Sequence, residues 1–184
     1  ILLAPTARHT AYHEDGEAAT IRGAKKGEAL YVQSSLGGTP LADVATVARE
    51  VGEPWWFQLY IQHDREWTSR LVEQAVQGGA TALAVTVDTP TLGARDRDKR
   101  DNLGSGAGAF YPILDGAPVN PDPTPAHRRI YNPHLSSNIT WADLEWLVDI
   151  SPVPVIPKGI LRPDDARRAV DLGGCPMTNG VRDD

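Results

Sequence analysis

Residues 55–61, Trp55-Trp56-Phe57-Gln58-Leu59-Tyr60-Ile61, form a short β-rich run of the kind that becomes a buried strand. Similar runs occur at Ile1–Ala7, Ala29–Ser35 and Ala82–Asp88, so that strands are expected to start about every 27 residues. Each run is followed by a segment with helical signals. Strands that alternate with helices in this way predict a parallel α/β sheet.

Helix start and stop signals lie between these runs. Thr39 can cap a helix that has Pro40 at its first position, and Asp64 can cap the next helix. The expected helix ends are glycines in the left-handed conformation, at Gly27, Gly52 and Gly78. These signals predict a helix after each strand, as parallel pairing requires.

The alternation breaks after Pro90. Residues 91–139 are rich in Gly, Pro, Asp, Asn and Arg, and we interpret them as a long loop insertion. A stretch of this length without helix or strand is uncommon in a compact domain and is usually functional or mobile. The alternation then returns as a helix at Thr140–Ile150, a strand at Val153–Gly159 and a helix at Pro163–Leu172.

The pattern predicts an incomplete TIM (β/α)8 barrel with about five to six of the eight strands. Pro176 and Gly180 make the sixth strand doubtful. We expect a single domain over residues 1–184 that is truncated at both ends, because Ile1 already lies in an apolar run and the pattern fails after Gly174. Composition alone leaves an open doubly wound sheet as the alternative.

Charge and cysteine content exclude several classes of protein. The net charge is −6, with 24 acidic and 18 basic residues, so there is no basic surface of the kind that binds nucleic acid. The single cysteine, Cys175, allows no internal disulfide and no cysteine metal cluster. No apolar run approaches the roughly 20 residues that span a bilayer. We therefore expect a cytoplasmic protein without nucleic-acid, membrane or metal partners.

Polar side chains stand where the predicted strands end. In a parallel barrel these carboxyl ends form the mouth that holds the active site. The strand ends are Pro5-Thr6-Ala7, Ser34-Ser35, Gln58-Leu59-Tyr60, Thr86-Val87-Asp88-Thr89-Pro90 and Lys158-Gly159. Buried polar groups need partners, so five such ends in succession predict a polar ligand across the mouth. The glycine-rich phosphate signatures are missing, which disfavours the usual nucleotide loops but not a flavin at the strand ends.

The residues at these strand ends, together with the segment 15–20, form an ordered series of motifs. The chain resembles the FMN-dependent α-hydroxy-acid oxidases and dehydrogenases, the family of glycolate oxidase, lactate oxidase, lactate monooxygenase and mandelate dehydrogenase. The resemblance runs from residue 1 to about residue 174, with the motifs in the family's order and spacing. They are Ala4-Pro5-Thr6-Ala7, Asp15-Gly16-Glu17-Ala18-Ala19-Thr20, Ser34-Ser35, Trp56-Phe57-Gln58-Leu59-Tyr60, Thr86-Val87-Asp88-Thr89-Pro90 with Leu92-Gly93, and Lys158-Gly159-Ile160-Leu161.

The resemblance implies a TIM barrel with FMN at the carboxyl mouth. It implies that the backbone of Pro5, Thr6 and Ala7 lies beside the flavin ring together with Ser34. It further implies that Gln58 and Thr86 bind the polar edge of the ring and that Lys158 lies beside N1 and the C2 carbonyl. A fixed cation there stabilises the negative charge that develops on the ring. Without the resemblance, Lys158 reads more readily as a strand-end lysine that reaches solvent.

The resemblance also implies a substrate site for a small 2-hydroxy acid, which is oxidised to the 2-oxo acid. Arg95 would grip the carboxylate through two parallel hydrogen bonds, and Tyr60 would hydrogen-bond the substrate. Asp88 would orient neighbouring groups, and Leu36 would form an apolar wall. From the residues alone, Arg95 belongs to a mixed charge run that is typical of a solvated face. Tyr60 could equally be a core aromatic residue.

One element of the family pattern is missing. The family places its catalytic histidine in a Ser-Asn-His-Gly-Gly-Arg pattern, whereas the matching stretch here reads Met177-Thr178-Asn179-Gly180-Val181-Arg182-Asp183. We therefore keep three alternatives: part of a hydroxy-acid oxidase, a degenerate non-catalytic flavin- or anion-binding fragment, or a truncated sequence without a stable fold. Among the five histidines, His134 is the first candidate for a substitute base. By family, a homotetramer is expected.

Overall fold

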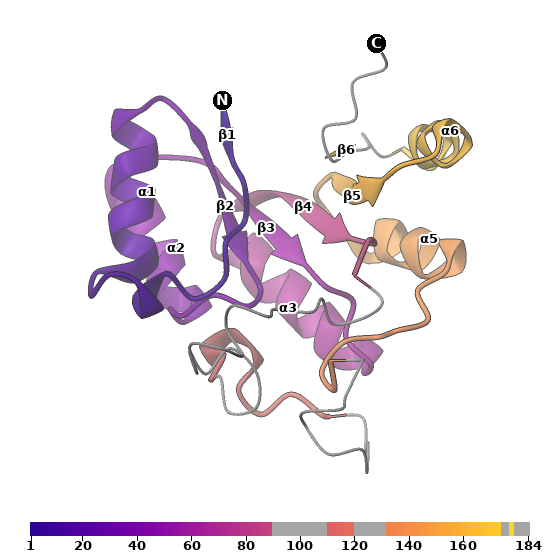
Figure 1. Ribbon diagram of the computed structural model, residues 1–184, viewed down its shortest axis with the longest axis horizontal. Helices are drawn as coiled ribbons and strands as arrows, with labels where there is room; N and C mark the ends of the chain where they lie inside the picture. The colour runs from indigo at the N-terminus through magenta and orange to yellow at the C-terminus, as the bar shows by residue number, and fades with distance from the viewer. Residues whose placement is uncertain (90–109, 120–131, 174–176, 179–184) are drawn as a thin grey trace, which may run out of the picture.

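The strands form one parallel sheet in chain order. The computed structural model describes residues 1–89, 110–119, 132–173 and 177–178. Within these residues six strands lie in the order β1-β2-β3-β4-β5-β6, and every neighbouring pair is parallel. The sheet curls as part of a barrel (Figure 1). The strands are β1 (Leu2–Leu3), β2 (Leu30–Ser34), β3 (Trp55–Leu59), β4 (Ala80–Thr86), β5 (Val155–Ile160) and β6 (Met177–Thr178).

Helices connect these strands on the outside of the curl (Figure 1). Chain-ordered parallel strands with outer helices are the arrangement of a TIM barrel, so the expectation of an incomplete barrel is confirmed and the open doubly wound sheet is not adopted. The α-helices are α1 (Gly16–Lys26), α2 (Leu41–Val51), α3 (Arg65–Gln77), α5 (Trp141–Ile150) and α6 (Pro163–Asp171). Two 3₁₀ turns, η1 (His9–Ala11) and η2 (Pro112–Leu114), lie in connecting segments.

Side chains alternate between two faces of the sheet. The outer face contributes large apolar groups to a core shared with the helices, of which Trp55, Phe57 and Leu83 are fully or almost fully buried. The inner face carries small and large residues in the strands, among them Val32, Trp56, Ala82 and Ala84. The inner positions at the carboxyl ends are polar. The alternation thus separates a packed outer core from an inner face that ends in hydrogen-bonding groups.

Several local expectations were right and others were wrong. Asp64 caps α3 by accepting from the Trp67 N–H at 2.9 Å, as predicted. Gly52 has a φ of 69° and ends α2 in the left-handed conformation, but Gly27 and Gly78 have φ values of −90° and −72°. After α3, the positive φ of 96° falls on Gly79 instead. The prediction of left-handed caps was therefore wrong at two of the three sites.

The predicted cap of α2 was also wrong. Pro40 occupies the N-cap position, and Leu41 is the first helical residue. The Thr39 hydroxyl donates to Glu17 Oε2 at 2.6 Å. A contact with a residue 22 positions earlier in the chain has thus replaced the local one.

The segment between β4 and β5 contributes to the core where the structure describes it. Ile113 and Leu114 of η2 are buried within the outer core. Further along, Leu135 forms an antiparallel bridge with Gln62, and Ser136 donates its N–H to Ile61 O at 3.0 Å. Parts of the predicted insertion 91–139 therefore pack against the loop that follows β3.

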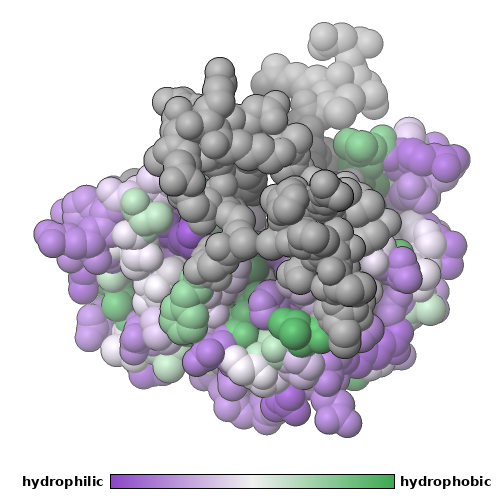
Figure 2. Space-filling model, turned by 60° about the horizontal axis from the view of Figure 1, so that its bottom comes forward, coloured by the Kyte–Doolittle hydropathy of each residue, from purple (hydrophilic) through white to green (hydrophobic). Residues whose placement is uncertain are grey.

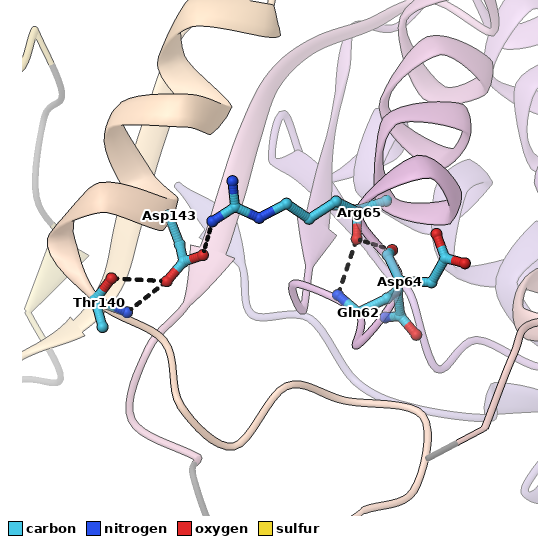
Figure 3. A network of polar contacts seen from close by, with 6 residues as sticks. Gln62, Asp64, Arg65, Thr140 and Asp143 are labelled. Carbon is cyan, nitrogen blue, oxygen red and sulfur yellow. Dashed lines mark hydrogen bonds and ion pairs between the residues drawn. The ribbon is translucent and has the colours of Figure 1, made fainter.

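Arg65 joins helices α3 and α5 beyond the end of β3 (Figure 3). Its guanidinium forms an ion pair with Asp143 and lies 4.8 Å from the ring centroid of Trp146. Asp143 also accepts from the backbone N–H and the hydroxyl of Thr140, as part of a capping box at the start of α5. These contacts hold neighbouring helices of the outer layer together.

Figure 2 shows one face of the molecule, on which the residues coloured by hydropathy are mostly hydrophilic and the hydrophobic ones form small separate patches. Within the described ranges, no helix is long and apolar enough to cross a membrane.

Candidate functional site

A chain of hydrogen bonds joins the carboxyl ends of three adjacent strands. Ser34 Oγ on β2 donates to Gln58 Oε1 on β3 at 3.1 Å, and Gln58 Nε2 donates to Thr86 Oγ1 on β4 at 2.9 Å. All three side chains are buried. We call Ser34, Gln58 and Thr86 the strand-end row. Parallel register places Ser34 directly beside Gln58, so the row follows from the inner-face alternation of neighbouring strands.

The row has a defined polarity. The amide of Gln58 is oriented by its neighbours, with oxygen toward Ser34 and nitrogen toward Thr86. Since a hydroxyl can accept and donate at once, Thr86 can still donate its own proton while it accepts from Gln58. Ser34 Oγ also accepts the Leu36 N–H at 3.1 Å, which fixes the start of the loop after β2. The row therefore offers directed neutral hydrogen-bonding groups.

A cation follows the row on the next strand. Lys158 on β5 lies in register with Thr86, and its Nζ is 3.6 Å from Asp88 Oδ1. The two side chains are 20% and 24% exposed, so this lysine is not a freely solvated surface group. The Val87 N–H donates to the Lys158 carbonyl at 2.9 Å and continues the pairing of the two strands. Lys158 thus extends the inner-face polar line to β5.

Gly159 makes room for this ion pair. Its φ is 108°, a value that side-chain-bearing residues rarely adopt. A Cβ atom at Gly159 would lie 2.5 Å from both Cβ and Cγ of Asp88. Only glycine therefore permits the Asp88 carboxylate to lie against β5 beside Lys158.

The predicted residues of the β1 loop lie beside the β2 loop. The Arg8 N–H donates to the Leu36 carbonyl at 3.1 Å, and this bond joins the segment that follows Pro5-Thr6-Ala7 to the segment that follows Ser34. Leu36 is half-buried and packs against the core. Thr6 is exposed, and its hydroxyl lies 3.5 Å from the Ala4 carbonyl. A direct backbone hydrogen bond thus joins these two loops.

The structure brings together only part of the predicted site. Ser34, Gln58 and Thr86 are hydrogen-bonded to one another, and Lys158 and Asp88 form an ion pair beside them. Tyr60 is half-buried directly after β3, and its carbonyl accepts from Gln62 Nε2 at 2.8 Å. Arg95 lies outside the described residues.

His134, the candidate substitute base, lies on the segment that packs against the β3 loop. Its carbonyl accepts the His63 N–H at 3.4 Å, and its Nδ1 is buried without a hydrogen-bond partner. Burial lowers the pKa of its imidazole. A neutral imidazole can accept a proton, but within the described residues the hydrogen bonds of His134 join it to Asn132 and His63 and not to the strand-end row.

Glu17 is a functional candidate that the sequence reasoning missed. It belongs to one of the family motifs, but the sequence alone assigned it no role. In the structure it is fully buried. A buried carboxylate needs hydrogen bonds or opposite charges to compensate it, and its membership of a motif was the signal that could have singled it out. Among the described residues, no group of three or more His, Cys, Asp and Glu side chains could hold a metal ion.

Known proteins resemble this chain over nearly its full length. The pattern of a family described as FMN-dependent dehydrogenase matches residues 1–176. The chain is 39% identical to an L-lactate oxidase of Nostoc sp., over 94% of this chain and 49% of that protein. It is 34% identical to a peroxisomal (S)-2-hydroxy-acid oxidase of rice, over 94% and 47% of the two chains. The chain spans about half the length of these relatives.

Solved structures give the same picture. A mandelate oxidase in complex with (S)-4-hydroxymandelic acid superposes with a TM-score of 0.77 at 31% identity, over 96% of this chain and 49% of that chain. A mandelate oxidase variant that carries an FMN adduct superposes with a TM-score of 0.76 at 29% identity, over 96% and 46% of the two chains. The part that they share with this chain is the half-barrel described above.

Proposed function

The chain belongs to the FMN-dependent dehydrogenase family, and from this premise we propose that its strand ends bind the isoalloxazine ring of FMN for the oxidation of a small 2-hydroxy acid to the 2-oxo acid. The observation that carries the proposal is the strand-end row with Lys158 beside it on the same face. Neutral donors together with one cation suit a ring edge that gains negative charge.

The donor set fits the cofactor. Gln58 and Thr86 present an amide and a hydroxyl that can hydrogen-bond the polar edge of a flat heterocycle. Lys158 would lie at the end of that edge, where its ammonium stabilises developing negative charge. The backbone of Pro5, Thr6 and Ala7, together with Ser34, would line the ring. Bound FMN supplies the acceptor for the two electrons that leave the substrate.

The substrate groups are assigned by the same logic. Arg95 would hold the carboxylate, Tyr60 would hydrogen-bond the substrate, and Leu36 would form an apolar wall. Asp88 would hold the Lys158 ammonium in place through their ion pair. The partner is therefore a small 2-hydroxy acid, and a homotetramer and a cytoplasmic location remain part of the proposal.

A second function follows from one observation in the sequence. Met177–Asp183 contains no histidine where the family pattern has its base. A general base contributes about 10²–10⁴-fold to a proton transfer. We accordingly propose that this chain by itself binds the flavin ring without turning over the substrate.

Riboflavin and anaerobic reduction test both proposals. Riboflavin carries the ring without the phosphate, so quenching of its fluorescence by the purified chain measures recognition of the ring alone. We expect saturable quenching, at least about 10-fold weaker in Lys158→Met, and no bleaching of bound FMN by lactate, glycolate or mandelate. Lys26→Met, which removes an exposed cation from the end of α1, is the matched charge control. Absent quenching would refute flavin binding, and rapid bleaching would refute inactivity.

A further inference from the structure

A second group of buried polar residues lies at the same end of the sheet, against α1. Its centre is Glu17, which has no exposed surface. Glu17 Oε1 accepts the His9 N–H at 3.2 Å and the Gly38 N–H at 2.6 Å. Glu17 Oε2 accepts the Thr39 hydroxyl at 2.6 Å. One carboxylate thus holds both the loop after β1 and the loop after β2.

The carboxylate is stabilised as an anion. Burial raises the pKa of the Glu17 carboxyl, but hydrogen bonds from Thr39, Gly38 and His9 outweigh burial, so the pKa lies below its ordinary value. Glu17 also lies in the first turn of α1, where the helix dipole favours negative charge. The group is therefore a charged anchor at neutral pH.

The β2 loop is shaped around this anchor. A Cβ atom at Gly37 would lie 2.1 Å from Gln33 Nε2 and 3.2 Å from Glu17 Oε1. A Cβ atom at Gly38 would lie 2.1 Å from Thr10 Oγ1, on the β1 loop. Two successive residues without side chains therefore bring the β2 loop against the carboxylate and against the β1 loop.

The same group is connected to the strand-end row through the backbone. The Tyr31 hydroxyl donates to Gln33 Oε1 at 2.7 Å, and Gln33 Nε2 donates to the Ser34 carbonyl at 2.8 Å. We call Glu17, Thr39, Tyr31 and Gln33 the Glu17 cluster. Gln33 of this cluster bonds the Ser34 carbonyl, and Glu17 bonds the Gly38 N–H, two residues after the Leu36 carbonyl that accepts from Arg8. The cluster thus supports the two segments that would line a flavin ring.

We propose that Glu17 is a positioning residue that fixes the distance between the β1 and β2 loops and thereby shapes the surface on which the flavin ring lies. The loop-fixing part stands on the hydrogen bonds alone, whereas the ligand part rests on the proposed function. Glu17 forms no hydrogen bond with Ser34, Gln58 or Thr86, so its effect on a ligand would pass through the two loops.

Hydrogen exchange tests the loop-fixing part without any ligand. In Glu17→Gln, the amide oxygen can still accept from the His9 and Gly38 N–H groups, but it lacks the negative charge that strengthens those bonds. The Thr39 hydroxyl must then turn to accept from the new amide nitrogen. We expect both amides to exchange at least about 10-fold faster, and to do so together, while β3 and β4 keep wild-type exchange. Glu50→Gln, on the exposed side of α2, is the matched control and leaves both loops unchanged. Unchanged exchange, or loosening of one loop only, would overturn the proposal.

A milder pair of variants covers the case in which Glu17→Gln does not fold. Thr39→Val removes one hydrogen bond to the carboxylate, and Thr39→Ser retains the hydroxyl. We expect faster exchange at the Gly38 and His9 amides in Thr39→Val and restoration in Thr39→Ser. Equal exchange in the two variants would contradict the role of the hydroxyl and, with it, the anchor.

Riboflavin affinity tests the ligand part. We expect Glu17→Gln to bind riboflavin at least about 10-fold more weakly, a change of about 1.4 kcal/mol, and Thr39→Ser to match the wild type. Joint loosening of the loops with unchanged affinity would show a merely structural role and overturn the ligand part. If the wild-type chain binds no riboflavin, the proposed function fails, and the exchange measurements alone decide the loop-fixing part.

Discussion

The strand-end row and the Glu17 cluster are both buried, both polar and both at the carboxyl end of the sheet, but they are built in opposite ways. The row is a line of neutral groups in which each side chain passes a hydrogen bond to the next strand. In the Glu17 cluster, the Thr39 hydroxyl and the backbone N–H groups of two loops converge on a single anion. An open line can offer its last donor to a ligand, whereas a convergent cluster uses its donors to hold loops.

The largest loss of stability is expected from Gly159→Ala, which disturbs the Lys158–Asp88 ion pair beside the strand-end row. Gly159→Ala would place a Cβ atom 2.5 Å from Asp88 on a residue with a φ of 108°. Strain and overpacking each cost about 1–3 kcal/mol, so we expect about 3 kcal/mol of lost unfolding free energy in urea titrations. The control is Gly52→Ala, which has a φ of 69° but no atom within 4 Å of the new Cβ. Equal losses in the two variants would argue against the Asp88 contact.

Two glutamines on opposite faces of the sheet sharpen the comparison. Gln58→Leu leaves the Ser34 hydroxyl without its acceptor, and Gln33→Leu does the same to the Tyr31 hydroxyl. Each should cost about 1–3 kcal/mol of stability, because a buried polar group loses its partner. Riboflavin affinity should fall at least about 10-fold in Gln58→Leu and much less in Gln33→Leu. Equal affinity losses would remove the distinction between the two regions.

Acid should weaken the Glu17 cluster before it affects the neutral row. Because hydrogen bonds hold the folded-state pKa of Glu17 below its ordinary value, its stabilisation is present at neutral pH and is lost as pH falls through the folded-state pKa. The difference in unfolding free energy between wild type and Glu17→Gln should therefore shrink below about pH 4. The difference between wild type and Gln58→Leu should stay constant, and a parallel decline would show that another group carries the acid effect.

Asp143 is the other described carboxyl with a lowered pKa. Burial raises its pKa, but hydrogen bonds from Thr140 and Arg65 and the charge of Arg65 outweigh burial. It therefore contributes acid sensitivity in the same direction as Glu17. Comparing each variant with the wild type at the same pH cancels this shared contribution.

The sequence predicted the row but not the cluster, for physical reasons. The polar strand ends are local signals that placed Ser34, Gln58 and Thr86 at one mouth, and the family resemblance singled these three out as residues beside a flavin ring. The helices and strands followed from the regular alternation of β-rich runs with helix signals. The contact that defines the cluster joins Glu17 with Thr39, and local rules assigned Thr39 to a helix cap instead.

Gly159 illustrates the same limit. Lys158-Gly159 was recognised as a strand end, but the need for glycine arises from Asp88, which follows the end of the neighbouring strand β4. Nothing in the local sequence indicates which side chain will approach a backbone from another part of the fold. Long-range contacts of this kind therefore required the structure.

The smallest loss of stability is expected from a variant at Arg65, which tests whether riboflavin affinity depends on the strand-end row and the Glu17 cluster or on the stability of the whole chain. Arg65→Met removes the ion pair with Asp143 but retains an apolar chain beside Trp146. Arg65 is about half exposed, so the loss should be about 1 kcal/mol or less, and removal of a cation from the N-terminus of α3 offsets part of it. Riboflavin affinity should not change. Arg65→Lys, which keeps the charge, is the control, and its stability should lie between those of Arg65→Met and the wild type. If Arg65→Met weakened riboflavin binding as much as Gln58→Leu, the affinity would follow global stability, and neither the row nor the cluster could be assigned a local role.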